Sequence, residues 1–258
     1  MAVAHGSRDP RAAATVEALL DEVRRARPWL EVRTAYLDHS TPTLAQALNG
    51  LEEAVVLPLL LTEAYHSRVD LPAALNEARA REPRLRVRYG ATLGPHPLLT
   101  ATLTRRLAEA GVTPGDPDTA VVLVAAGSSD ARANAVITDM ARSWSRRAPA
   151  AGRSLPVGLR GATLGGRGWW AVTAAYASAA APTPEQAVAR LRRAGAPRVA
   201  VAPYLLAPGY FADKVRRTTL DAGADVVADV LGPAPEIARV LLERYEAALM
   251  SPAGVVAS

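Results

Sequence analysis

Short apolar runs alternate with amphipathic segments along the whole chain. In the first amphipathic segment, Val16, Leu19, Leu20 and Val23 recur at the spacing of one helix face, whereas residues 55–61 form a continuous apolar run. Continuous apolar runs indicate strands buried on both faces, as in a parallel sheet covered by helices on each side. The pattern predicts strands at residues 3–4, 32–37, 55–61, 85–89, 120–125, 171–177, 199–206 and 226–230. After a helix that follows the turn at residues 5–10, it predicts further helices over residues 43–51, 71–81, 98–110, 131–145, 184–194, 212–222 and 235–248.

The second half of this alternation repeats the first in residue detail. Ala4, Gly6, Ser7 and Asp9 recur 121 residues later as Ala125, Gly127, Ser128 and Asp130. Three further matches follow in the same order along the chain. The second match pairs Ala35-Tyr36, Pro42-Thr43 and Gln46-Ala47 with Ala175-Tyr176, Pro182-Thr183 and Gln186-Ala187. The third pairs Pro58, Leu60, Leu61 and Tyr65 with Pro203, Leu205, Leu206 and Tyr210, and the fourth pairs Leu93-Gly94-Pro95 and Pro97 with Leu231-Gly232-Pro233 and Pro235. The offset rises from 121 to 140, which indicates an insertion between about residues 148 and 168. Trp169 and Trp170, beside this insertion, fit either a lid over a flat ligand or the core of the second half.

The segment GVTPGDPD at residues 111–118 separates the two copies and lacks apolar periodicity. We therefore expect an α/β protein of two similar Rossmann-like lobes, over residues 1–113 and 119–258. Each lobe should hold a parallel sheet of about four strands flanked by helices, with a cleft between the lobes.

All four histidines lie in the first copy. In the second copy His5 aligns with Ala126, His39 with Ala179, His66 with Phe211 and His96 with Ala234. A histidine needed for packing has no reason to be absent from every counterpart, so we expect one site per chain. His5 and His66 each follow a predicted strand, and ligands of parallel sheets bind beyond the carboxyl ends of the strands. His39 and His96 each lie beside turn-forming residues that also explain them.

Composition narrows the chemistry of this site. The chain has no cysteine, so a metal would be held by His, Asp, Glu or backbone oxygen. Two imidazoles with the carboxylate of Asp38, after the second strand, would suit divalent cobalt, iron, nickel or zinc and leave coordination positions open. The net charge is +5, but 29 of the 30 basic residues are scattered arginines, which does not indicate a nucleic-acid partner. Without a leader pattern or about 18 consecutive apolar residues, we expect a soluble cytoplasmic protein with no membrane partner.

Three segments resemble the class II chelatases, the CbiX-type and SirB-type sirohydrochlorin cobaltochelatases and ferrochelatases, and more distantly protoporphyrin ferrochelatase. They are AHGSRDP at residues 4–10, AYLDHSTPTL at 35–44 and VVLPLLLTEAYHSRVDLP at 55–72. The resemblance implies a lyase that inserts Co²⁺ or Fe²⁺, with Ni²⁺ a further candidate, into sirohydrochlorin or a related acidic tetrapyrrole for cobalamin or siroheme synthesis. It implies that His5 and His66 bind the metal and accept pyrrole protons, with an acidic residue at position 38 completing the site. The metal is then a substrate, and no organic cofactor is implied.

Sirohydrochlorin is rich in carboxylates, so cationic groups beside the ligands would orient it. We expect Arg8 and Arg68 in this role, with Ser7 and the Gly6 turn holding one carboxylate, although Arg8 could instead pair with Asp9 or Glu17. Tyr65 is expected to pack beside the substrate or gate it. The rival hypotheses are a non-catalytic carrier of metal or tetrapyrrole, a chelatase-like enzyme adapted to another substrate and, far behind, a histidine phosphatase. Because the duplicated chain supplies both lobes, we expect a monomer rather than an obligate dimer.

Overall fold

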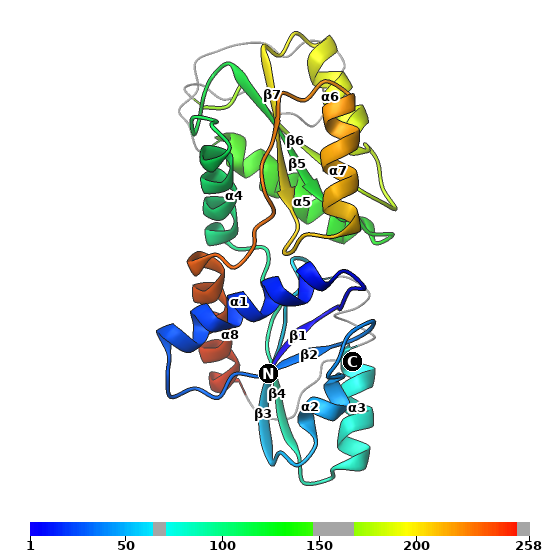
Figure 1. Ribbon diagram of the computed structural model, residues 1–258, viewed down its shortest axis with the longest axis vertical. Coiled ribbons are helices and arrows are strands. Elements are labelled where there is room, and N and C mark those ends of the chain that lie inside the picture. Colours follow the sequence, from blue (N-terminus) through cyan, green and yellow to red (C-terminus); the bar gives the residue numbers. More distant parts are fainter. Residues whose placement is uncertain (64–70, 147–167, 252–258) are drawn as a thin grey trace. The chain divides into compact units, whose positions relative to one another are not determined.

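The computed structural model describes residues 1–63, 71–146 and 168–251, which divide into two compact units (Figure 1). The first unit comprises Met1–Leu98 and Gly232–Ser258, and the second comprises Leu99–Leu231. The predicted insertion lies almost wholly outside the described residues. Within the described ranges, no helix combines the length and apolar character needed to cross a membrane.

The first unit is built on a parallel four-stranded sheet in the order β2-β1-β3-β4. Its strands are β1 (Ala2–Ala4), β2 (Thr34–Tyr36), β3 (Glu53–Pro58) and β4 (Arg86–Tyr89). Its helices are α1 (Pro10–Ala26), α2 (Leu44–Leu48), α3 (Leu71–Arg81) and α8 (Pro235–Met250). One apolar core joins α2 and α3 to strand residues such as Val3, Val56 and Val87, while α8 packs against α1, β3 and β4. Because both faces of the sheet are covered, its strands carry the continuous apolar runs seen in the sequence.

The second unit repeats this topology with the strand order β6-β5-β7-β8, also parallel. Its strands are β5 (Thr119–Ala125), β6 (Ala171–Tyr176), β7 (Arg198–Tyr204) and β8 (Val226–Val227). Its helices are α4 (Pro97–Glu109, from Leu99 onward), α5 (Ala131–Arg146), α6 (Pro184–Arg193) and α7 (Tyr210–Asp221). The predicted α/β class and the internal repeat are therefore confirmed, with all sixteen predicted elements present and β8 the most shortened.

The two tryptophans beside the insertion belong to the core of the second unit. Trp169 is buried and packs edge-to-face on Trp144, with ring centroids 6.0 Å apart. Trp170 packs against the core cluster, and its backbone N–H donates to the Thr119 carbonyl at 2.8 Å. Of the two roles that the sequence left open for these residues, the contacts favour packing.

The last helix of each sequence repeat packs in the compact unit of the other repeat. Helix α4, encoded in the first half, belongs to the second unit, and α8, encoded last, belongs to the first. The exchange is reciprocal in detail: the Arg106 guanidinium on α4 donates to the Leu231 carbonyl at 2.9 and 3.2 Å, and Arg244 on α8 donates to the Leu93 carbonyl at 3.3 Å. The compact units therefore differ from the predicted division at 1–113 and 119–258, which follows the repeat and not the packing of its final helix.

Candidate functional site

The first site residue, His5, lies exposed directly after β1, at the carboxyl edge of the first sheet. Its loop is bound to the loop after β2, because the His5 carbonyl accepts from the Asp38 N–H at 2.9 Å. Gly6 has φ +96°, and a Cβ there would lie 1.7 Å from the Asp38 carbonyl oxygen. Only glycine allows the two loops to approach this closely, so Gly6 sets His5 beside Asp38.

Asp38 and His39 form the second part of the site. The Asp38 carboxylate accepts from the backbone N–H of His39 at 2.7 Å and lies 3.3 Å from its ring Nε2. The His39 ring in turn meets the His5 ring edge-on, with centroids 6.4 Å apart and an interplanar angle of 76°. The structure thus joins His5 and Asp38 through their backbones, and the ring of His39, which the sequence left undecided, contacts the side chains of both. Its replacement by Ala179 in the second copy was the available signal.

The same loop frame is present in the second unit without the imidazoles. Gly127 has φ +90°, and a Cβ there would lie 2.0 Å from the Ser178 carbonyl oxygen. The Ser178 N–H donates to the Ala126 carbonyl at 2.9 Å, as Asp38 does to His5. Ala179 has φ +57°, close to the φ +58° of His39. The left-handed backbone at position 39 therefore belongs to the duplicated frame, and the histidine side chains are the addition that distinguishes the first copy.

Ser7 and Arg8 begin the turn into α1. The Ser7 Oγ accepts from the Asp9 N–H at 3.0 Å, and the Ser7 backbone N–H donates to Ser40 Oγ at 3.2 Å. Asp9 caps α1 and binds Arg11 at 2.6 Å, and the hydrogen bonds from the Arg11 side chain hold the pKa of its carboxyl below the usual value. Arg8 is exposed, and the carboxylates with which it could have paired are engaged elsewhere, Asp9 by Arg11 and Glu17 by Arg24.

His96 has a structural role outside this group. Its Nδ1 accepts from the Leu98 backbone N–H at 3.2 Å at the start of α4, and its Nε2 lies 3.1 Å from a Glu243 carboxylate oxygen on α8. Both ring nitrogens are engaged within the first unit. These contacts explain the residue as one that fixes the chain before α4.

The remaining candidates, Tyr65, His66 and Arg68, lie outside the described residues. Among the residues that the structure does describe, no three His, Asp or Glu side chains are grouped closely enough to hold a metal ion. A metal site made by His5, His66 and Asp38 therefore stays a prediction.

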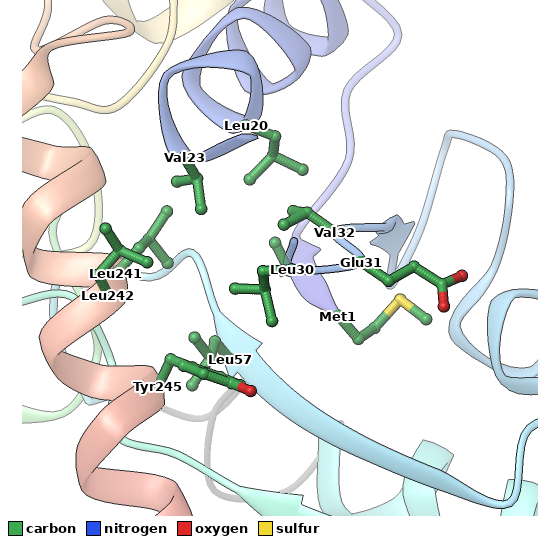
Figure 2. Close-up of a pocket in the computed structure, with 11 residues that line it drawn as sticks. Met1, Leu20, Val23, Leu30, Glu31, Val32, Leu57, Leu241, Leu242 and Tyr245 are labelled. Atoms are coloured by element: carbon green, nitrogen blue, oxygen red, sulfur yellow. The ribbon is translucent and has the colours of Figure 1, made fainter. Parts of the chain in front are cut away.

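An apolar pocket in the first unit lies at the opposite edge of the sheet, around residues that precede β1 and β2. Figure 2 shows Leu20 and Val23 of α1, Leu241 and Leu242 of α8 and Leu57 of β3 around it. Glu31 is the charged side chain among its lining residues, and none of the candidate site residues is among them. This pocket lies at the junction of α1 with α8, and its lining side chains are mainly apolar.

Comparisons with known proteins identify the family and the fold of the chain. A family model described as CbiX matches residues 1–110 and 120–248, one match for each repeat. A sirohydrochlorin cobaltochelatase of Priestia megaterium is 26% identical over 265 residues, covering 96% of this chain and 78% of that protein. A sirohydrochlorin ferrochelatase of the same organism is 25% identical, covering 96% of this chain and 90% of that protein. The solved structure described as SirB from Bacillus subtilis with Fe3+ superposes with a TM-score of 0.76 at 21% identity, covering 96% and 94% of the two chains.

Proposed function

The chain belongs to the CbiX family, and we propose that it is a sirohydrochlorin chelatase, a lyase that inserts divalent cobalt or iron into the macrocycle. The cobalt and iron alternatives both come from relatives that match almost the whole chain, one a cobaltochelatase and the other a ferrochelatase. Nickel is a third candidate on the ligand chemistry of imidazole alone.

One observation carries this proposal: a duplicated loop frame bears histidines in only one of its copies. The two frames match in their glycine contacts and in the left-handed backbone at positions 39 and 179. The frame alone is therefore accounted for by folding, and the imidazoles of the first copy require another reason. A single asymmetric site that handles one metal ion supplies that reason.

Metal insertion exchanges two pyrrole N–H protons for one divalent metal ion, so the site must bind the ion and accept protons. A neutral imidazole does either through one nitrogen lone pair, and its ordinary pKa lies near neutrality. We assign the metal to His5 and His66, with Asp38 as the carboxylate. The exposed position of His5 leaves room for the macrocycle, and the contact with His39 orients the Asp38 carboxylate.

The substrate is a polycarboxylate, so groups beside the metal ligands would bind its periphery. We assign this role to Arg8, whose neighbouring carboxylates are engaged by other arginines, and to Ser7 in the same turn. Tyr65 and Arg68 are assigned to the substrate on the resemblance. The monomeric state, the cytoplasmic location and the lack of a nucleic-acid partner stay predictions.

The experiment is to follow the absorbance spectrum of sirohydrochlorin with Co²⁺ or Fe²⁺ under anaerobic conditions. The wild type is compared with His5→Ala, His66→Ala and the rate without protein. His96→Ala is the matched control, because it removes an imidazole whose two nitrogens serve packing. We expect the first two variants to fall to the background rate and the control to keep the insertion rate at a temperature where it is folded.

A wild type that binds the macrocycle but leaves the insertion rate at background would establish a carrier in place of an enzyme. If His5→Ala retained full activity, the one-sided site would be wrong whatever the activity of the chain.

A further inference from the structure

Two aromatic side chains lie exposed at the start of α7 in the second unit. Tyr210 is 74% exposed and Phe211 is 40% exposed, and their rings meet edge-to-face with centroids 5.7 Å apart. Neither side chain contributes to the core cluster of this unit. Adjacent large aromatics on the surface are unusual in a globular protein, and such patches commonly mark a binding site.

The fold places this pair where parallel sheets bind ligands. Strands β5 and β7 are neighbours, and the chain leaves β5 toward β6 on one side before it returns to β7 on the other. Ligands of open α/β sheets bind beyond the carboxyl ends of the strands at this reversal of strand order. Helix α7 follows β7 after a five-residue connection, residues 205–209 (Figure 1). The pair at the start of α7 therefore lies at this edge.

Two alanines lie at the same edge as the pair, in loops that also carry serines. Ala126 follows β5 and Ala179 follows β6, and both are exposed at the counterparts of His5 and His39. The second copy of the frame keeps the tyrosine of the first copy, with Tyr210 at the counterpart of Tyr65, and carries Phe211 at the counterpart of His66. Alanine methyls and aromatic rings provide an apolar surface without ligands for a metal, which suits contact with a flat organic ring.

A cation lies one helical turn from the aromatics. Lys214, the single lysine of the chain, is three residues after Phe211 and four after Tyr210, which puts it on the same helix face. Its side chain is partly buried, and within the described part of the chain no carboxylate forms an ion pair with it. Arg217, exposed, follows Lys214 by three residues. An ammonium group beside aromatic rings complements a ligand that has an apolar face and carboxylates at its periphery.

We propose that Tyr210, Phe211 and Lys214 form a macrocycle-binding surface, with the aromatic rings against the tetrapyrrole and the ammonium group on a peripheral carboxylate. The identity of the macrocycle as sirohydrochlorin rests on the proposed function. In this assignment the second copy of the frame, which lacks the imidazoles, provides a binding surface for the organic substrate.

Titration of metal-free sirohydrochlorin into the protein, followed by absorbance, tests the proposal without turnover. We expect the double variant Tyr210→Ser, Phe211→Ser to raise the Kd at least about tenfold, because stacking on aromatic side chains commonly contributes this much. Leu220→Ser is the matched control, since Leu220 lies at the far end of the same helix and is 43% exposed. The control should leave the Kd unchanged.

A second pair of variants tests the cation. Lys214→Gln should raise the Kd several-fold at low salt, with the difference shrinking as salt screens the ion pair. Arg193→Gln removes an exposed charge at the end of α6, which lies at the opposite edge of the sheet, and should have no effect. Thermal unfolding of all four variants checks that each is folded.

Unchanged sirohydrochlorin affinity in the aromatic double variant, or no binding by the wild type, would overturn the proposal. So would a result in which the variant alters sedimentation but not affinity, because the patch would then be a contact between copies of the chain. If the wild type binds sirohydrochlorin through these residues yet does not accelerate metal insertion, the proposed function fails while the binding surface stands.

Discussion

At the scale of single residues, the tightest constraint on the candidate site is the absence of a side chain at position 6. A Cβ on Gly6 would enter the Asp38 carbonyl oxygen at 1.7 Å, and the backbone there has a φ that L-residues rarely adopt. The loop that carries His5 cannot move away from the loop that carries Asp38 without breaking the 2.9 Å hydrogen bond from the Asp38 N–H to the His5 carbonyl. The relative position of His5 and Asp38 therefore depends on this glycine.

Gly6→Ala is expected to lower the free energy of unfolding by about 2 kcal/mol or more and to abolish metal insertion in the protein that remains folded. Gly50→Ala is the control, because Gly50 also has positive φ (+73°) but its added methyl would meet no atom within 4 Å. We expect the control to cost about 1 kcal/mol and to keep the insertion rate. Urea unfolding and the insertion assay measure both; wild-type stability in Gly6→Ala would contradict the proposed loop contact.

Asp225 is expected to make the stability of the second unit depend on pH. Burial raises the pKa of its carboxyl, but the Val199 N–H at 2.6 Å and the Arg192 guanidinium at 2.5 Å outweigh burial, and the pKa is lowered overall. Because its pKa is lower in the folded state, the ionised Asp225 carboxyl stabilises the folded protein above about pH 4. This stabilisation is lost as the pH falls through the folded-state pKa.

We expect Asp225→Asn to destabilise the protein by about 1 kcal/mol at pH 7, a modest value because the Asp225 side chain is 40% exposed to screening solvent. The difference from wild type should shrink as the pH falls below 4, because the wild-type carboxyl then takes up its proton. Urea unfolding at pH 7 and pH 3 measures it. A difference that stays constant between these pH values would assign the effect to packing.

At the scale of elements, periodicity predicted the strands and helices because each element satisfies its own pattern locally. Residues 55–61 are apolar throughout because α8 covers one face of β3 and the cluster with α2 and α3 covers the other. The position of His39 could not be predicted in the same way, since it depends on a left-handed residue in a loop. The packing of α4 and α8 could not be predicted from the pattern either. The apolar face of each helix could equally well cover the sheet of either repeat.

A substitution of Arg106 on α4 tests the contact between this helix and the Leu231 carbonyl in the second unit. We expect Arg106→Ala to lower the free energy of unfolding by about 1 to 3 kcal/mol, since it leaves the Leu231 carbonyl without its partner. Arg105→Ala is the matched control, because Arg105 is on the same helix and also pairs with Glu109, at 2.6 Å. Chemical denaturation compares the two variants, and equal losses would show that the Leu231 contact contributes little.

At the scale of the whole molecule, duplication has produced two units with the same topology. One is formed by a single continuous stretch of chain and the other by two separate stretches. The second unit is a single stretch, Leu99–Leu231, whereas the first needs Gly232 onward to supply α8. In this chain, neither sequence repeat coincides with a packed unit.

We therefore expect a fragment of residues 99–231 to unfold cooperatively by itself, and a fragment of residues 1–98 to lack cooperative unfolding until a peptide of residues 232–251 is added. The reason is that α8 covers β3, β4 and one side of α1. Near-ultraviolet circular dichroism during thermal unfolding measures both fragments. Cooperative unfolding of residues 1–98 alone would show that α8 is dispensable for the first unit.

The late position of α8 in the chain imposes an order on synthesis. Once residue 231 has left the ribosome, the second unit has all of its own residues, while the first still lacks the helix that covers its sheet. His5, translated among the first residues, thus belongs to the unit that is completed last. In the nascent chain, the second unit can therefore fold before the unit that carries His5 and Asp38 has received its last helix.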